Sequence, residues 1–147
     1  MGARTGYRLV KLAEMLLVLA DRTLEPLGVR TKHVHILETL LADDSLSQQD
    51  VSRLLGIDPN VLVGVLDELE ARGFAERRRN PKDRRRHVIQ VTEAGRALVA
   101  ESTRALDRAE EEFFAVLPAE DRAKIHTSTG VLLGAYRSGW WEGDCER

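Results

Sequence analysis

The sequence predicts a mainly helical protein with one small β-hairpin, an α+β fold in which strands are the minority. Three observations support this prediction. Apolar residues recur at helical spacing through much of the 147-residue chain. A short helix, a glycine turn and a longer helix are expected between residues 47 and 72. Two short strand-like segments then flank an arginine-rich loop, in which Asn80-Pro81 marks the turn.

The first predicted helix runs from Tyr7 to about Thr23. It is apolar on more than one face, which indicates that it packs against two neighbours at once. Pro26 and Gly28 end the helical pattern. Its spaced apolar residues are Tyr7, Val10, Leu12, Met15, Leu16 and Leu19.

A second helix is expected to begin at Thr31, which has the side chain of an N-cap residue. The residues that its spacing turns inward are Val34, Leu37, Leu40 and Leu41.

The next two helices have clear start and stop signals. Ser47 followed by Asp50 resembles a capping box, and Gly56 suits the left-handed residue that ends a helix. Asp58 and Pro59 then supply an N-cap acceptor and a proline where no amide donor is needed. The buried side of the first helix is expected to hold Val51, Leu54 and Leu55, and that of the second Leu62, Val65, Leu66 and Leu69.

The rest of the chain predicts a hairpin and two helices. Gly73 ends the second helix of the pair, and residues 74–78 and 87–91 have the composition of strands. Helices are expected over about 93–116, before Pro118, and about 120–136. The tail that follows has no clear periodicity, and the sequence assigns no role to Trp140-Trp141 or to Cys145.

Charge is distributed unevenly along the chain. The formal net charge is only -2, but residues 72–86 hold eight basic and two acidic residues, so this segment carries +6 and the remainder -8. A basic patch on an acidic body orients a protein in the field of a nucleic acid.

Other features narrow the class of protein. The single Cys145 excludes an internal disulfide framework, and Lys11 and Glu14 interrupt the N-terminal apolar run, so we expect a cytoplasmic protein without a membrane span. No glycine-rich phosphate loop, nucleophile elbow or zinc-protease motif is present, so neither an enzyme nor a cofactor is expected.

The helix pair and the hairpin together predict a winged helix-turn-helix, in which the second helix enters the major groove of DNA. Asn60 can pair with an adenine edge, and Val61 or Val63 can contact a thymine methyl group. The alternative is that the two valines are further core residues. The positions outside the inward stripe are Pro59, Asn60, Val61, Val63, Gly64 and Asp67.

The predicted wing has two arginine triplets, which repel each other unless phosphates neutralise them. An arginine at its tip can enter a narrow minor groove. A solvated charged loop is the alternative, and the position directly after a helix-turn-helix favours DNA. The wing residues assigned to DNA are Arg77, Arg79, Lys82, Asp83, Arg84, Arg85 and Arg86.

From about Val29 to Leu98 the sequence resembles the MarR family of bacterial transcription regulators. The resemblance rests on LSQQDVSRLLGI, LDELEARGFAERR, NPKDRRR and VTEAGRAL in combination. It implies a homodimer of winged helix-turn-helix lobes joined by N- and C-terminal dimerisation helices. We therefore expect residues 31–92 to form the DNA-binding domain, and residues 1–30 and 93–147 to form the dimerisation region.

The resemblance also implies roles for matching residues. Residues 58–72 would form the recognition helix, Arg85 would enter the minor groove, and Asp83 would hold it. Arg77 occupies the usual basic position of the first wing strand, and Ser47 and Gln48 match positions that touch phosphate. Members of the family often have polar or basic residues where this chain has Pro59, Val61, Val63 and Gly64, so base hydrogen bonds should be sparse.

Many relatives release DNA when a small phenolic or lipophilic molecule binds, so the expected function is a homodimeric repressor of a palindromic operator with such an effector. His33 and His35 are candidate ligand residues, although either can be a structural histidine. A metal-responsive regulator and a winged-helix protein-interaction module remain alternatives. The four histidines are scattered without an i, i+4 pair, so no metal site is predicted.

Overall fold

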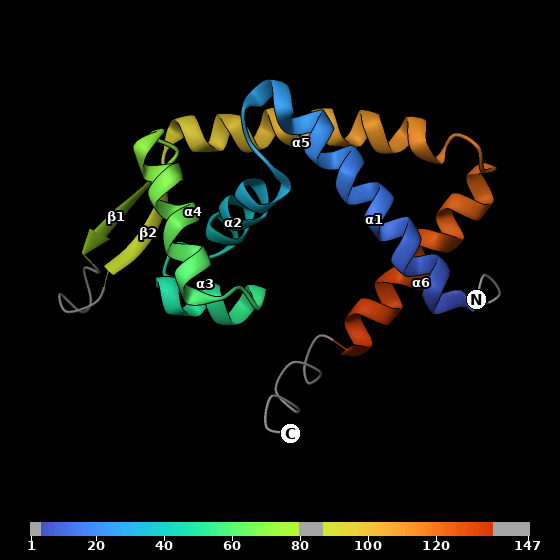
Figure 1. Cartoon of the computed structure of the whole chain (residues 1–147), viewed down its shortest axis with the longest axis horizontal. Helices are drawn as coiled ribbons and strands as arrows, with labels where there is room; N and C mark the ends of the chain where they lie inside the picture. The colour runs from blue at the N-terminus through green and yellow to red at the C-terminus, as the bar shows by residue number, and fades with distance from the viewer. Residues whose placement is uncertain (1–3, 80–86, 137–147) are drawn as a thin grey trace. The chain divides into compact units, whose positions relative to one another are not determined.

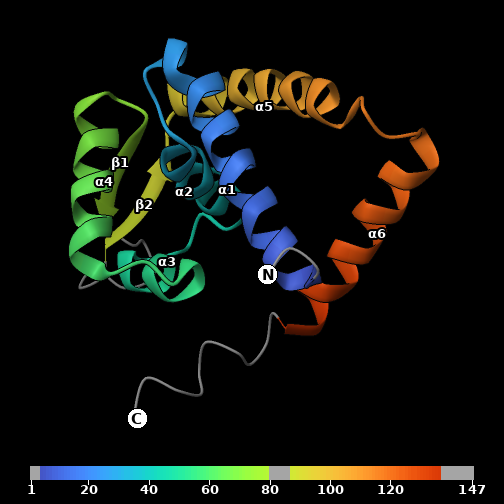
Figure 2. The same ribbon diagram turned by 45° about the vertical axis from the view of Figure 1, so that its right-hand side comes forward.

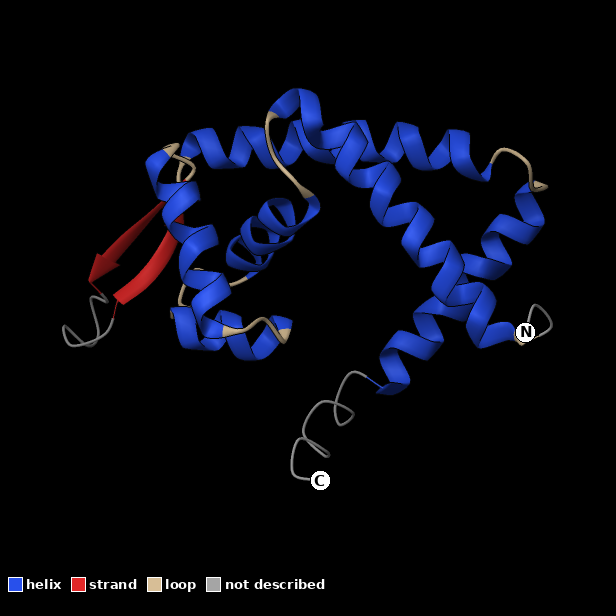
Figure 3. Cartoon of the chain, viewed as in Figure 1, coloured by secondary structure: helices blue, strands red, loops and turns tan. Residues whose placement is uncertain are grey.

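The computed structural model describes residues 4–79 and 87–136. Most of these residues are helical and one antiparallel hairpin accompanies them, which confirms the predicted fold class (Figures 1 and 3). The elements, in chain order, are α1 (Thr5–Leu24), a 3-10 turn η1 (Glu25–Leu27), α2 (Thr31–Ala42), α3 (Gln48–Leu55), α4 (Pro59–Ala71), β1 (Ala75–Arg79), β2 (His87–Val91), α5 (Glu93–Phe114) and α6 (Ala119–Tyr136).

The chain forms two compact units. Residues 1–109 make the first, which contains the helix-turn-helix, the hairpin, α1 and most of α5. Residues 110–147 make the second, which contains the end of α5 and α6. The prediction that 31–92 bind DNA while 1–30 and 93–147 dimerise is a functional division, and it stays a prediction.

The core of the first unit gathers around α2, with α3 and α4 packed beside it and the hairpin next to α4 (Figure 2). The inward stripe predicted for α4 is confirmed, since each of its four members is at most 3% exposed. The most deeply buried apolar residues of this core are Leu24, Ile36, Leu37, Leu40, Val51, Leu62, Leu66, Leu69 and Ile89.

The hairpin is covered on both faces. Its register pairs Ala75 with Val91 and Arg79 with His87. Val88 and Ile89 point to opposite faces, yet both are buried, which explains why apolar residues do not strictly alternate along β2. The Ile89 N–H also donates to the Leu46 carbonyl at 3.4 Å, which ties β2 to the segment before α3.

The prediction that Thr31 caps α2 is wrong. Arg30 is the N-cap residue, and its N–H donates to Nδ1 of His33 at 2.9 Å. The N–H and the hydroxyl of Thr31 both donate instead to Asp21 of α1, at 2.9 and 2.7 Å. The backbone hydrogen bond from Thr31 is the main cause that lowers the pKa of Asp21. The threonine therefore joins α1 to α2 rather than capping its own helix.

The burial predicted for Leu54 is also wrong, because this side chain is 64% exposed. Val51 and Leu55, one turn apart, turn toward the core, and a helix of eight residues has room for only that narrow stripe. β1 begins at Ala75 rather than at Phe74, whose N–H donates to the Leu69 carbonyl at the end of α4.

α1 keeps apolar residues exposed, so the prediction that it packs against two neighbours stays a prediction. Met15 is 60% exposed and Val18 is 53% exposed. The other exposed apolar residues of this helix are Tyr7, Leu9, Val10 and Leu17. In the described ranges, no helix is long and apolar enough to cross a membrane.

Candidate nucleic-acid interface

The turn between α3 and α4 is fixed by short-range hydrogen bonds. Ser47 and Asp50 form the predicted capping box, in which the Ser47 N–H donates to the Asp50 carboxylate at 3.0 Å. Gly56 has a φ of 61°, a conformation that other residues rarely adopt, so it ends α3 as expected. The Ser52 hydroxyl donates to the Ile57 carbonyl at 2.7 Å and closes the turn.

The start of α4 is held by Asp58. Its Oδ1 accepts from the N–H groups of Asn60 and Val61, at 2.8 and 3.3 Å, and Pro59 follows it at the first helical position. These contacts satisfy two amides that would otherwise lack partners, and they fix the direction in which the helix leaves the turn.

Replacing Asp58 by alanine is expected to lower the free energy of unfolding by about 1 kcal/mol, because it removes this cap. Thermal unfolding followed by circular dichroism measures the change. Asp58→Asn is the matched control, since asparagine also caps helices well and should retain most of the stability. An alanine variant as stable as the parent protein would show that the cap contributes nothing.

The predicted base-contacting residues lie on the outward side of α4. Val61 is 56% exposed and Val63 is 37% exposed, so the alternative that these valines are core residues is wrong. Pro59, Asn60 and Gly64 are exposed as well. The structure therefore brings five of the predicted site residues together on one helix, within two turns of its N-terminus.

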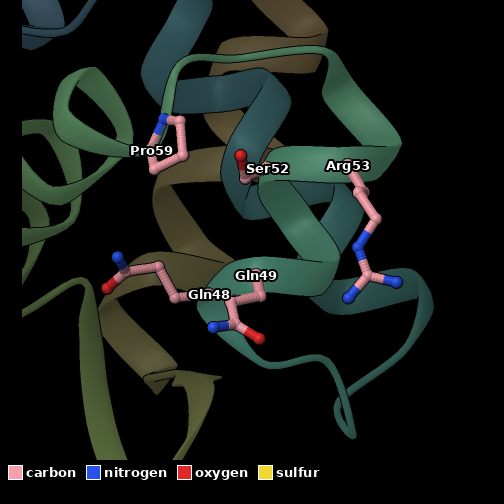
Figure 4. Close-up of a pocket in the computed structure, with 5 residues that line it drawn as sticks. All are labelled: Gln48, Gln49, Ser52, Arg53 and Pro59. Atoms are coloured by element: carbon pink, nitrogen blue, oxygen red, sulfur yellow. The ribbon is translucent and has the colours of Figure 1, made fainter.

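A shallow pocket of about 250 Å³ opens between the starts of α3 and α4 (Figure 4). Gln48, a predicted phosphate-contacting residue, lines it, and Ser47 lies directly before it in the chain. The pocket is lined by Gln48, Gln49, Ser52, Arg53 and Pro59. Sequence reasoning missed Gln49 and Arg53, although their i, i+4 spacing places both on one side of α3.

Negative charge is confined to the C-terminal half of α4. Between Pro59 and Leu66 the helix has no charged residue, whereas Asp67, Glu68 and Glu70 follow. A phosphate backbone would be repelled by these carboxylates, and the positive end of the helix dipole lies at the opposite end. The N-terminal half is therefore the part of α4 that suits a polyanion.

Two neighbouring side chains contact these carboxylates. Arg77 of β1 pairs with Asp67 at 2.8 Å and also with Glu70. Nε2 of His33 lies 2.8 Å from Glu68, and this hydrogen bond is the main cause that lowers the pKa of Glu68. Ion pairs with Arg77 thus hold α4 against the hairpin, and the hydrogen bond with His33 holds it against α2.

Arg77 was predicted to contact DNA, but the structure commits its guanidinium to two carboxylates of α4, and the side chain is 30% exposed. Arg79 is exposed at the end of β1, as a phosphate contact requires. Between them, Arg78 pairs with Glu76 at 2.6 Å. The signal that sequence reasoning overlooked is the pair of acidic residues spaced i, i+3 on the preceding helix.

Replacing Arg77 by glutamine is expected to lower DNA affinity about fivefold, because two uncompensated carboxylates near phosphates cost on the order of 1 kcal/mol. The slope of log K against log salt should stay nearly constant. A fluorescence-anisotropy titration over several salt concentrations measures both quantities. A slope reduced by about 0.9 would show that Arg77 contacts a phosphate instead.

The two candidate ligand histidines differ in their surroundings. His33 is 6% exposed, and both ring nitrogens are engaged, Nδ1 by the Arg30 N–H and Nε2 by Glu68. Nδ1 accepts the Arg30 N–H while Nε2 faces the Glu68 carboxylate, so the ring acts as a structural bridge between the start of α2 and α4. His35 is exposed on α2. Among the residues that the structure describes, no group of three or more His, Cys, Asp or Glu side chains is arranged to hold a metal ion.

The tip of the predicted wing lies outside the described residues. This applies to Lys82, Asp83, Arg84, Arg85 and Arg86, and to the turn predicted at Asn80-Pro81. Their assignments remain predictions from the sequence.

Comparisons with known proteins agree with this geometry. The sequence model of the MarR family matches residues 27–86. YdgJ of Bacillus subtilis (strain 168), an uncharacterized HTH-type transcriptional regulator, is 30% identical over 95 residues, which are 65% of this chain. The match spans 58% of that relative's length.

Solved structures extend the similarity over most of the chain. A MarR family transcriptional regulator from Rhodococcus sp. RHA1 is 27% identical with a TM-score of 0.78, covering 91% of this chain and 94% of its own. CouR from Rhodococcus jostii RHA1, bound to p-coumaroyl-CoA, is also 27% identical with a TM-score of 0.80, covering 95% and 96%. The transcriptional repressor CouR on a 23-mer DNA duplex gives 26% identity, a TM-score of 0.80 and coverage of 89% and 93%. The family model and the structural similarity coincide on the helix-turn-helix, so residues 27–86 match the MarR family and the chain as a whole shares the fold of MarR family regulators.

Proposed function

We propose that this protein is a sequence-specific double-stranded DNA-binding transcription regulator, a homodimeric repressor that a small-molecule ligand releases from its operator. One observation carries the proposal. The outward side of the N-terminal half of α4 is exposed and uncharged, Asp58 caps its start, and α4 packs against the strand that leads into the basic segment. The duplex-bound structure of CouR, a protein of similar fold, supports it. Such a protein acts in the cytoplasm, where bacterial DNA lies.

In this proposal the described interface divides into two kinds of contact. Gln48 and the exposed Arg79 meet phosphates on either side of the groove, with Ser47 beside Gln48. The outward residues of α4, from Pro59 to Gly64, face base edges, because residues near the start of a recognition helix reach the bases. Arg77 does not contact DNA in this proposal. Its ion pairs with Asp67 and Glu70 instead give it the role of positioning α4.

Dimerisation is proposed for the helices outside the helix-turn-helix. The exposed apolar residues of α1 suit a surface that a second copy covers. In the second unit, Val131 of α6 is 66% exposed and Leu133 is 72% exposed. A twofold dimer presents two copies of α4, so its operator should be an inverted repeat.

The proposed effector is an aromatic or lipophilic small molecule. A protein of similar fold, CouR, has been solved with p-coumaroyl-CoA, whose coumaroyl group is aromatic. His33 is set aside as a ligand residue, since its two ring nitrogens already have partners. His35 remains a candidate, because its side chain is exposed.

Selection of bound duplexes from a random pool tests the proposed function. The full-length protein should enrich an inverted repeat whose half-site centres lie about one helical turn apart or a multiple of it. Enrichment of a single unrepeated site would contradict the twofold arrangement. Failure to enrich any sequence would contradict sequence-specific DNA binding.

Arg85 is the wing residue for which we expect the largest single effect on affinity. Arg85→Ala should weaken binding to the selected duplex by about tenfold to a hundredfold, since a buried charged contact in a narrow groove is lost. Arg84→Ala is the matched control and should weaken specific and non-specific binding alike, as loss of a phosphate contact does. If both substitutions weakened binding to the selected duplex and to a scrambled duplex by the same factor, the distinction between a groove contact of Arg85 and a phosphate contact of Arg84 would be refuted.

A further inference from the structure

Gly64 has no explanation within the protein itself. It lies in the middle of α4, its φ is not positive, and a Cβ atom built on it meets nothing within 4 Å. Glycine is among the least favourable residues for the interior of a helix, because it leaves the backbone the most freedom to lose. The folded chain therefore gains nothing from this glycine. The absence of a side chain would matter to a partner that approaches the helix from outside.

The neighbours of Gly64 on that surface are aliphatic. Asn60, Gly64 and Asp67 follow one another along the outward line of α4, at i, i+4 and i+7. Val61 and Val63 flank this line and remain 56% and 37% exposed. An exposed valine leaves apolar surface in water, and valine also has a lower helix propensity than unbranched residues. The placement of both valines on this surface therefore also indicates a partner.

The chemistry of this surface limits which bases it can contact. Guanine is usually recognised by arginine or lysine, and residues 59–66 contain neither. Asn60 can recognise adenine through its amide. Thymine presents a C5-methyl group in the major groove, which aliphatic side chains contact well. Because Gly64 has no Cβ, the backbone of α4 can approach those methyl groups more closely at this position.

We propose that Val61, Val63 and Gly64 form a thymine-methyl contact surface, so that each half-site is recognised mainly through the methyl groups of thymine and through the pairing of Asn60 with adenine. This inference rests on the proposed function, since it names the bases that the same helix contacts. Arginines of the wing supply affinity through phosphates, and α4 supplies discrimination between base pairs through shape and methyl contact.

The first test removes single methyl groups from the DNA. In the duplex recovered by selection, each dT is replaced in turn by dU, which keeps the base pair and deletes the methyl group. At least one position in each half-site should lose affinity about fourfold, the effect of burying one methyl group. In the Val61→Ala or Val63→Ala protein, that position should no longer distinguish dT from dU, because the side chain that covered the methyl group is gone.

Results of this test separate the two proposals. Strong binding to the selected duplex with no loss at any dU position overturns the methyl contact and leaves DNA binding intact. Absence of binding to the selected duplex overturns the proposed function itself. A loss at a dU position that persists unchanged in both alanine variants would assign the effect to the DNA rather than to the valines, and it would also overturn the contact.

The second test adds one methyl group to the protein. Gly64→Ala should raise Tm by about 2–4 °C, because alanine favours the helix and nothing occupies the space. It should at the same time weaken binding to the selected duplex about tenfold, because the new Cβ keeps the helix away from the bases. A misfolded variant would lose both stability and affinity, so the opposite signs are diagnostic.

Unchanged DNA affinity of Gly64→Ala would overturn the close approach. If a second copy of the chain docked on this face, the substitution would reduce self-association in sedimentation and leave DNA affinity unchanged. That result would likewise contradict the proposal.

Discussion

Gly95→Ala is expected to destabilise the protein by about 3 kcal/mol, at the upper end of the cost of overpacking a core. Gly95 lies in the first turn of α5, where a Cβ atom would come within 2.1 Å of the Phe74 carbonyl oxygen and 2.7 Å of Val91 Cγ1. That carbonyl accepts the Thr92 N–H at 3.1 Å, so neither the backbone nor the new side chain can easily move aside. The hairpin and α5 would have to separate.

Thermal unfolding should show a fall in Tm of roughly 10 °C, given the usual relation between stability and Tm for a chain of this size. Gly64→Ala is the matched control, because it makes the same substitution in a helix with no atom near the new Cβ. The two variants should therefore shift Tm in opposite directions. A Gly95→Ala protein that unfolds at the parent temperature would mean that the start of α5 does not pack against Phe74 and Val91 as described.

The double substitution Met15→Asp with Val18→Asp is expected to abolish the proposed dimer. Both side chains lie on the exposed apolar face of α1, and each would be buried twice in a twofold pair. Losing about 1.5–3 kcal/mol for each buried side chain raises the dissociation constant of the dimer about ten-thousand-fold or more.

Sedimentation velocity at micromolar concentrations measures the change, and DNA binding should fall with it, since a monomer contacts only one half-site. Lys11→Ala is a suitable control, because it removes only exposed contacts, an ion pair with Glu14 and a cation–π contact with Tyr7. If the double variant sediments as the parent protein does, α1 has no part in the assembly.

The local signals of the helix-turn-helix made it predictable. Ser47 with Asp50, Gly56 and Asp58 act through hydrogen bonds or backbone angles within a few residues of themselves, so their structure follows from their neighbours in the chain. The amphipathic stripe of α4 was equally clear, because a single apolar face at helical spacing leaves one possible orientation toward the core.

Features that depend on distant residues were not predictable. Thr31 has the chemistry of an N-cap, but Asp21, ten positions away, binds it, and the ring of His33 takes over the cap. Leu54 is as apolar as Leu55, and only the packing of α3 decides which of them is buried. Local propensity is a weak guide wherever tertiary contacts compete with it.

The assignment of Arg77 shows the same limit at the candidate site. A basic residue on a wing strand predicts a phosphate contact when only the sequence is known. The structure places the carboxylates of Asp67 and Glu70 around its guanidinium, which changes its proposed role from binding DNA to positioning the recognition helix. These ion pairs depend on the packing of β1 against α4, which the sequence alone does not give.

The central claim is that the uncharged N-terminal half of α4 enters the major groove while basic residues around it bind phosphates. Titration of the selected duplex at increasing salt tests it most directly. The account predicts a tight complex in dilute salt, whose log K falls linearly with log salt by about 0.9 for each phosphate contacted. No complex in dilute salt, or an affinity that salt does not change, would contradict it.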